Sequence, residues 1–282
     1  MSIIKVIDPG FSSSLQDRGR RGPQSLGVPI SGPMDHISFK LANAILDNFV
    51  NDALMECTMS GPTLLFQEET EICLTGAEVD IRVNDRLESS YKRITVKKGD
   101  ILKVGNFKKG IRCYIAIRFG FISPEFMDSK SFFYPLSPQG FLSANDILEF
   151  TPFKTKTAGT GSRVRSPKLW SKNILRVQKG PEWDFVKEQQ DQLLNRPLLI
   201  GPNNRMGYRI ESTLERSWPE MFSSAVIPGT IQATPSGELL AATADCQVSG
   251  GYPRILMLDQ EALSILSQKK TGEQITLDLL PD

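Results

Sequence analysis

The sequence contains few of the residues that metal and redox chemistry need. Its 282 residues include four cysteines and one histidine. The cysteines, Cys57, Cys73, Cys113 and Cys246, are far apart and form no Cys-x-x-Cys pair, so we expect neither a disulfide framework nor a bound metal. Any Ser-His-Asp, Cys-His or multi-histidine scheme would have to use His36. We favour a capping or packing role for this histidine, because it stands at the start of a predicted helix.

An excess of one charge and long apolar runs are also absent. The chain has 33 basic and 32 acidic residues, which gives no electrostatic reason to bind nucleic acid or anionic lipid. No apolar run approaches the ~20 residues that cross a bilayer, and the first residues lack the layout of a signal peptide. Neither Gly-x-x-x-x-Gly-Lys-[Ser/Thr] nor Gly-x-Gly-x-x-Gly occurs, so nucleotide chemistry would need another architecture or another protein chain. We expect a soluble, cytoplasmic protein that binds no nucleic acid and no membrane.

Short apolar runs that end in turn residues dominate the chain from Glu56 onward. Their spacing of roughly 8–12 residues is typical of a β-sandwich or barrel. The predicted strands include 79–83, 101–104 and 112–118, with a turn at Lys109-Gly110. Helical spacing predicts a helix over Ile37–Leu46 with Asp35 as its N-cap, and a second over Glu261–Gln268. The sequence therefore predicts a mainly β protein with a few short helices.

The length favours two domains of about 100–150 residues each. Residues 151–167 are dominated by Thr, Lys, Gly, Ser and Arg and show no apolar periodicity, which is typical of a linker. We predict a first domain over residues 1–155, a linker over 156–169 and a second domain over 170–282.

The stretch Gly229–Pro253 has the composition of a β-hairpin, with turns at Pro235-Ser236-Gly237 and Gly250-Gly251. Its small residues stand where the backbone must come close to another group. Polar side chains beside such turns can contact a ligand, although an ordinary hairpin with turn glycines is the alternative. The polar residues of this stretch are Gln232, Asp245, Gln247, Ser249 and Tyr252.

Two other polar, glycine-punctuated segments are candidates for a site. Residues 12–22 carry three arginines and Asp17. Arginine forks suit carboxylate or phosphate ligands, but Asp17 could equally pair with its own arginines on the surface. Residues 203–209 form a second polar turn that leads into a strand.

Several different short motifs are spread along nearly the whole chain. They are Leu15-Gln16-Asp17-x-Gly19-Arg20, Gly27-Val28-Pro29-x-Ser31-Gly32-Pro33-Met34-Asp35, Ala42-Asn43, Gly61-Pro62, Leu74-Thr75-Gly76-Ala77, Gly99-Asp100, Gly110-x-Arg112-x-Tyr114-x-Ala116, Gly180-Pro181, Arg205-Met206-Gly207-Tyr208-Arg209, Gly229-x-Ile231-Gln232 and Gly250-Gly251-Tyr252-Pro253. In this order they resemble the biotin-dependent carboxyltransferase-like family. That family includes the C subunit of 5-oxoprolinase, the antagonist of a bacterial sporulation-kinase inhibitor, and the carboxyltransferase portion of urea carboxylase.

The chain departs from the family pattern mainly in candidate ligand loops. A Gly-Ser-Arg-Ser-Thr element is replaced by Asp128-Ser129-Lys130-Ser131-Phe132, and a Gly-Arg-x-Leu element by Gly140-Phe141-Leu142. Phe119-Gly120 stands at the position of a Gly-Gly pair in the family pattern. Val248 stands for a threonine, which removes a hydroxyl group.

The resemblance implies two tandem cyclophilin-like β-barrel domains, with a ligand cleft where the polar motifs of both halves converge. It also implies a component similar to the C subunit of an ATP-dependent 5-oxoprolinase, which converts 5-oxo-L-proline to L-glutamate; this component would be inactive alone. Such a site needs donors for a developing oxyanion and a cation for a carboxylate or phosphorylated intermediate. The implied catalytic residues are Asp17, Asp35 and Asp245, and the implied substrate-binding residues are Gln16, Arg20, Ser31, Arg205, Arg209, Gln232, Gln247 and Tyr252.

The implied partners are homologues of the other two components of bacterial 5-oxoprolinase: its B subunit, which is a kinase-inhibitor-like protein, and its A subunit. ATP would be bound by, or shared with, a partner. Two alternatives are a regulatory binding protein that antagonises a kinase inhibitor and a carboxyltransferase that uses an external biotin carrier. Biotin is not expected on this chain, because it has no Met-Lys-Met-like attachment site.

Overall fold

The computed structural model describes residues 2–138, 140–153, 164–215 and 218–281. It is mainly β, as predicted, and divides into two compact units. One contains Met1–Arg20 and Ser31–Ser171, and the other contains Arg21–Ile30 and Lys172–Asp282. The sequence did not predict that residues 21–30 group with the second unit. Residues 156–163 of the predicted linker lie outside the described residues, and at its end Leu169–Ser171 forms a short 3-10 helix, η2, in which Leu169 is buried.

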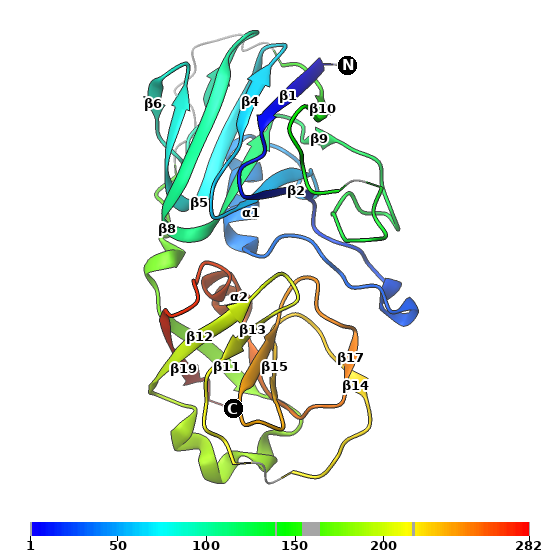
Figure 1. Cartoon of the computed structure of the whole chain (residues 1–282), viewed down its shortest axis with the longest axis vertical. Coiled ribbons are helices and arrows are strands. Elements are labelled where there is room, and N and C mark those ends of the chain that lie inside the picture. The colour runs from blue at the N-terminus through cyan, green and yellow to red at the C-terminus, as the bar shows by residue number, and fades with distance from the viewer. Residues whose placement is uncertain (1, 139, 154–163, 216–217, 282) are drawn as a thin grey trace. The chain divides into compact units, whose positions relative to one another are not determined.

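The first unit is built on a ten-stranded sheet with the order β2-β3-β8-β4-β1-β10-β9, in which β5 pairs with β6, β7 and β8 (Figure 1). Apolar side chains from nearly all of these strands pack into one core cluster. The sheet therefore wraps around its own core as a barrel does. Its strands are β1 (Ser2–Asp8), β2 (Ser12–Gln16), β3 (Leu54–Thr58), β4 (Thr63–Phe66), β5 (Thr70–Val83), β6 (Arg86–Glu88), β7 (Ile94–Val96), β8 (Ile101–Ile117), β9 (Phe121–Ile122) and β10 (Ile147–Phe150).

Two long strands replace several of the short strands that the sequence predicted. β5 and β8 run through 14 and 17 residues, and the predicted turn at Lys109-Gly110 was wrong because both residues lie inside β8. The pairing of β5 with β8 shifts register beyond Gly76. Gly76 has φ 95° and Gly110 has φ 76°, so these glycines serve irregular positions in a continuous ladder rather than a chain reversal.

Helix α1 (His36–Ile45) covers one face of the first sheet. Alternate residues of β8 separate the two sides: Cys113 and Ile115 belong to the barrel core, whereas Tyr114 and Ala116 pack with the helix. This is the two-residue period of a strand buried on both faces. Asp35 is the N-cap, as predicted.

The second unit contains a closed barrel with the order β11-β18-β15-β16-β13-β12-β19, and a separate pair of strands, β14 and β17 (Figure 1). The hairpin turn predicted at Pro235-Ser236-Gly237 is confirmed, because β15 and β16 pair antiparallel across it, whereas Gly250 of the second predicted turn lies in the strand β17. Helix α2 (Gln260–Leu266) follows the N-cap Asp259, and two 3-10 helices, η3 (Trp183–Phe185) and η4 (Lys187–Gln192), precede β12. The strands are β11 (Ile174–Lys179), β12 (Pro197–Asn203), β13 (Gly207–Ile210), β14 (Ser224–Ala225), β15 (Thr230–Ala233), β16 (Leu239–Ala242), β17 (Ser249–Gly250), β18 (Arg254–Leu258) and β19 (Gln274–Leu279).

Within the described residues, no helix is long and apolar enough to cross a membrane.

Candidate functional site

The second unit holds a cavity of about 310 Å³ beside strands β13, β15 and β16. Its lining combines side-chain amides with apolar side chains. The lining residues are Pro202, Asn203, Asn204, Met206, Gly207, Arg209, Val226, Gln232, Leu240, Ala242, Cys246 and Gln247. The volume lies at the lower end of the range for small-molecule sites, about 300–1,000 Å³.

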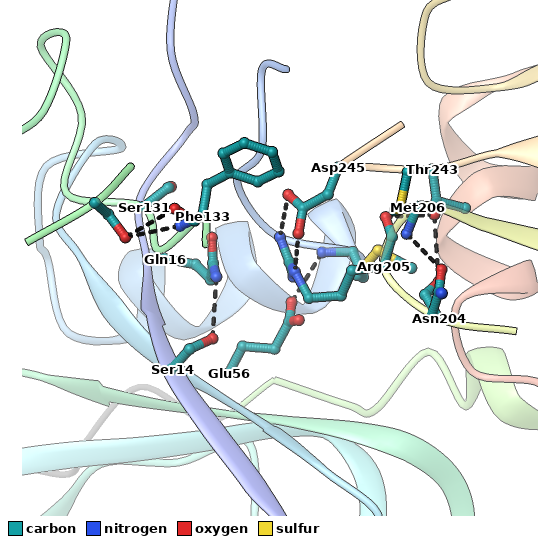
Figure 2. A network of polar contacts seen from close by, with 12 residues as sticks. Ser14, Gln16, Glu56, Ser131, Phe133, Asn204, Arg205, Met206, Thr243 and Asp245 are labelled. Atoms are coloured by element: carbon teal, nitrogen blue, oxygen red, sulfur yellow. Dashed lines mark hydrogen bonds and ion pairs between the residues drawn. The ribbon is translucent and has the colours of Figure 1, made fainter. Parts of the chain in front are cut away.

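Arg205 and Asp245 hold two loops of this cavity together (Figure 2). The Arg205 guanidinium donates from Nε to Asp245 Oδ2 at 2.7 Å and from Nη2 to Oδ1 at 3.1 Å. Two further hydrogen bonds repeat the link, because the Asp245 backbone N–H and the Thr243 side-chain hydroxyl both donate to the Arg205 carbonyl. Asn204 Oδ1 accepts from Met206 N at 2.8 Å and closes the turn. The loop is therefore fixed by a two-armed ion pair and by its own backbone.

Gln232 and Gln247 supply amide groups to the cavity wall. Gln232 is 1% exposed, and its Nε2 donates to the Tyr252 carbonyl at 3.1 Å. A Cβ atom at Gly250 would lie 2.8 Å from Gln247 Nε2 and 3.1 Å from Gln232 Nε2. The absence of a side chain at Gly250 therefore lets both amides approach the same stretch of backbone. This is the close approach that the glycine composition of Gly229–Pro253 predicted.

Charges around the cavity are paired. Arg209 lines it and donates to Glu238 Oε2 at 3.0 Å, with its own side chain 60% exposed. The Cys246 thiol also lines the cavity, and burial, followed by the neighbouring Asp245 carboxylate, raises its pKa to about 12. The thiol is thus uncharged at neutral pH. Tyr252 is 39% exposed and contributes its carbonyl to Gln232.

In the first unit, Asp17 organises a buried polar cluster. Its Oδ1 accepts from Ser129 Oγ at 2.6 Å, from Ser131 Oγ at 2.7 Å and from Gly19 N at 2.8 Å. Its Oδ2 accepts from Lys130 N at 2.7 Å. Four donors on one carboxylate fix the loop that carries Ser129 and Ser131, and the proton-transfer role of Asp17 stays a prediction.

Arg20, Gln16 and Ser31 are also buried in this unit. Arg20 donates from Nη2 to the Ser131 carbonyl and lies over the Phe126 ring at 5.6 Å. Gln16 Nε2 donates to Ser14 Oγ at 3.0 Å (Figure 2). Among the described residues, Gln16 Oε1 and Ser31 Oγ have no hydrogen-bond partner. Buried polar atoms in this state are unusual and suit groups that receive a ligand.

Asp35 belongs to a different buried cluster. Its carboxylate accepts from Ser38 N at 2.9 Å and from Ser38 Oγ at 2.6 Å. Its backbone N–H donates to Tyr114 Oη, which in turn donates to Glu56 Oε2 at 2.7 Å. Burial, with Glu56 and Asp35 as neighbouring charges, holds the pKa of Tyr114 well above its usual range. Asp35 is thus engaged in helix capping, and a catalytic role for it stays a prediction.

The structure places the predicted residues in separate groups within each unit. Arg209, Gln232 and Gln247 line the cavity, with Arg205 and Asp245 paired at its loops. Asp17 and Arg20 both contact Ser131. Whether the polar motifs of the two units converge on one cleft stays a prediction. Within the residues that the structure describes, no group of three or more His, Cys, Asp or Glu side chains could hold a metal ion.

Sequence reasoning assigned no functional role to Asn203, Asn204, Glu56 or Tyr114. The two asparagines lie in a polar turn that was recognised, but their neighbour Arg205 received the functional role. Glu56 is 2% exposed at the centre of β3. A buried acid in an otherwise apolar strand was the available signal for this residue.

A model of the carboxyltransferase domain, subdomains A and B, matches residues 26–279. The chain is 30% identical to the C subunit of 5-oxoprolinase from Haemophilus influenzae, over 98% of this chain and 91% of that protein. The crystal structure of the K. lactis urea amidolyase matches 99% of this chain with a TM-score of 0.86 and 29% identity, but only 19% of that chain is covered. The crystal structure of TTHA0988 matches the whole chain with a TM-score of 0.87 and 24% identity, and this chain spans 56% of its length.

Proposed function

The chain belongs to the family of the carboxyltransferase domain, subdomains A and B, and we propose that it is the C subunit of an ATP-dependent 5-oxoprolinase. In this role it acts with partner subunits to open 5-oxo-L-proline to L-glutamate. The observation that carries the proposal is the extent of the similarity to a 5-oxoprolinase C subunit, which covers nearly all of both chains.

The chemistry of the cavity in the second unit supports a cyclic amide as the ligand. A lactam is planar and uncharged, offers a carbonyl and an N–H group, and has an apolar ring. Gln232 and Gln247 can hydrogen-bond the amide, and Val226, Leu240 and Ala242 can pack against the ring. Arg209 lines the cavity beside its ion-pair partner Glu238, and its guanidinium can also donate to the carboxylate of 5-oxoproline.

Ring opening needs activation of the amide before water can attack it, because an amide is a poor electrophile. Donors near the carbonyl oxygen stabilise the charge that develops there. In this proposal the glutamine amides orient the lactam, and a partner protein binds ATP or shares it. The lack of a phosphate-binding loop in the sequence supports this division of work.

The test is reconstitution from purified subunits. This chain, the partner subunits and their mixture are assayed for glutamate formation from 5-oxoproline with ATP. Activity is expected from the mixture alone, and Gln232→Leu in the cavity should lower it at least about tenfold, the loss of one oriented hydrogen bond in a site. Gln178→Leu, at an exposed position of β11, is the matched control and should leave it unchanged. Turnover by this chain alone, or an inactive mixture, would contradict the proposal.

The similarity to urea amidolyase supports a second candidate, carboxyl transfer from an external biotin carrier. A ureido ring shares the planar, uncharged amide character that the cavity suits. Transfer of carboxyl from a carboxylated carrier to a small amide, with no ATP-dependent glutamate formation, would favour this candidate over 5-oxoprolinase activity.

A further inference from the structure

The strands β14 and β17 form a small sheet that is separate from the closed barrel of the second unit (Figure 1). They pair antiparallel over two residues each, and Val226 N donates to the Val248 carbonyl at 3.0 Å. We call residues 224–226 and 248–250 the ribbon. A two-stranded ribbon is at best marginally stable by itself in water. Its position therefore depends on the groups of the barrel that it contacts.

The ribbon forms part of the cavity wall. Val226 lines the cavity, and so does Gln247, the residue that precedes the second segment of the ribbon. A Cβ atom at Gly250 would lie 3.4 Å from Val226 Cγ2 and 2.8 Å from Gln247 Nε2. Both lining groups therefore lie against the same residue of the ribbon, and a displacement of the ribbon would move both of them.

Arg254, the first residue of β18, bonds the ribbon to the barrel. Its Nη1 donates to the Ala225 carbonyl at 3.1 Å. Two other guanidinium nitrogens donate to one carboxylate: Nε donates to Glu182 Oε2 at 2.9 Å, and Nη2 donates to Oε1 at 2.7 Å. The planar guanidinium thus joins a carboxylate on one side to the ribbon carbonyl on the other.

Glu182 and Arg254 are also linked through their backbones. Arg254 N donates to Glu182 Oε2 at 2.9 Å, and Glu182 N donates to the Arg254 carbonyl at 3.2 Å. Gly180 makes this approach possible, because a Cβ atom there would lie 2.1 Å from the Arg254 carbonyl oxygen. The two side chains are only 22% and 13% exposed for Arg254 and Glu182. The guanidinium is therefore fixed on the barrel, and its bond to the ribbon has a defined direction.

We propose that Arg254 is a positioning residue for the cavity, which holds the ribbon so that Val226 and Gln247 stand where a ligand contacts them. Glu182 orients the guanidinium for this task. The effect on catalysis rests on the proposed function, in which Gln247 orients the lactam, whereas the placement of the ribbon does not depend on the reaction. Lysine cannot take this role, because an ammonium group is a point charge without the planar fork that reaches both acceptors.

The first measurement of the test is hydrogen exchange of the purified chain and of the variants Arg254→Lys and Arg254→Gln. The Val226 amide reports on the ribbon, and the amides of β13 and β16 report on the barrel. We expect the Val226 amide to exchange at least about tenfold faster in both variants, because loss of a charge-assisted hydrogen bond loosens the ribbon, while the barrel amides are unchanged. Arg176→Lys is the matched control, because Arg176 pairs with two carboxylates at the start of α2, and it should change neither set of amides.

The second measurement is steady-state turnover of 5-oxoproline by the mixture with the partner subunits. Both Arg254 variants should lower kcat/KM about tenfold, mainly through a higher KM, because a misplaced binding group weakens the hold on the substrate and on the transition state alike. A purely structural role would instead lower kcat through a smaller folded fraction and leave KM unchanged. Arg176→Lys should turn over as the unchanged chain does.

The outcomes separate the positioning role from the reaction. Exchange of the Val226 amide that is unchanged in Arg254→Gln, or that is matched by equally faster exchange throughout the barrel, would overturn the proposal. Normal exchange and normal KM in Arg254→Lys would also overturn it, since charge alone would then be sufficient. A loosened ribbon with an unchanged KM would reject the role in the cavity wall. If the unchanged chain and its partners form no glutamate, the proposed function fails, and the exchange data alone decide whether Arg254 positions the ribbon.

Discussion

Arg205 and Asp245 form a two-armed ion pair at a place where their side chains are only 14% and 8% exposed. The same residues are linked through their backbones, because Asp245 N donates to the Arg205 carbonyl at 2.8 Å. The pair therefore joins the turn after β12 to the turn after β16, and both turns supply residues to the cavity. The Arg205 guanidinium therefore shapes the cavity. It is less able to bind a ligand directly than the sequence motif suggested.

Replacement of Arg205 by alanine should destabilise the protein. It leaves the Asp245 carboxylate largely buried without its cation, and removal of one partner of a buried pair costs about 3–5 kcal/mol. Urea unfolding monitored by fluorescence measures the change. Arg209→Ala is the control, because the Arg209 side chain is 60% exposed, and it should cost about 0–1 kcal/mol. Equal stability of the two variants would contradict a structural role for Arg205.

Asp17→Asn should also lower stability, because its two carboxylate oxygens accept four hydrogen bonds and one of these oxygens becomes an NH2 group that cannot accept. We expect a loss of about 2–3 kcal/mol in the free energy of unfolding, the range for hydrogen bonds to a charged group. Asp80→Asn, whose ion pair with Lys108 is solvent-exposed, is the matched control. A variant of Asp17 with normal stability and no activity in the reconstituted enzyme would instead identify Asp17 as catalytic.

Gly250→Ala tests the amide wall of the cavity. The new Cβ would lie within 2.8 Å of Gln247 Nε2, and the flexible glutamine must move away. We expect the midpoint of urea unfolding to change little, since a side-chain end yields at low cost, while activity of the reconstituted enzyme falls about tenfold because misplaced positioning groups slow catalysis. Gly105→Ala, where the nearest atom is Asp80 O at 3.7 Å, should have neither effect. Unchanged activity in Gly250→Ala would remove these amides from the site.

Stability should fall in acid partly through Glu182. Arg254 donates from Nη2 to Glu182 Oε1 at 2.7 Å and from Nε to Oε2 at 2.9 Å, and it holds the pKa of Glu182 below its ordinary value of 4.5. Because the folded-state pKa is the lower one, this stabilisation is complete above pH 4.5 and is lost as the pH falls through the folded-state pKa. Glu182→Gln should therefore be less stable than the unchanged chain at pH 7, and the difference should shrink below pH 4.5. A stability difference between the two proteins that stays constant down to about pH 3 would refute the assignment.

In the native protein, at about pH 8, the cysteines should not react with thiol reagents. All four are buried, and burial raises the pKa of Cys57 and Cys73 to about 12. In urea, four thiols per chain should react. Cys246 should be the first to react as urea is added, because it borders the cavity, and Cys246→Ala should remove that first phase. Rapid native labelling of a different cysteine would contradict this order.

The parts of the fold that local patterns determine were predicted from the sequence. Asp35 caps α1 because its carboxylate is placed to accept from Ser38 N, and the turn at Pro235-Ser236-Gly237 reverses the chain between β15 and β16. The turn predicted at Lys109-Gly110 failed for a non-local reason. Gly110 lies where β8 continues past an irregularity in its pairing with β5, and a glycine in an irregular ladder looks the same in sequence as a glycine in a turn.

Some of the residues that line the cavity were identified from the sequence, and their role in a binding site stays a prediction. Gln232 and Gln247 were identified because they lie beside glycine turns, and both line the cavity. The partners of the charged residues were not predictable. Arg205 meets Asp245 from 40 residues away, and only the closed barrel brings two such loops together.

The strand that closes the second barrel has a consequence for the way this unit folds. β19 pairs in parallel with β11 and antiparallel with β12. In the parallel pair, Ile174 lies opposite Thr276, which is about a hundred residues further along the chain. Contacts of such large sequence separation raise the contact order, and the entropy of closing the intervening loop must be lost before they form. The barrel can therefore close only after the ribosome has released residue 279, and until then the edges of β11 and β12 are open to pairing with other chains.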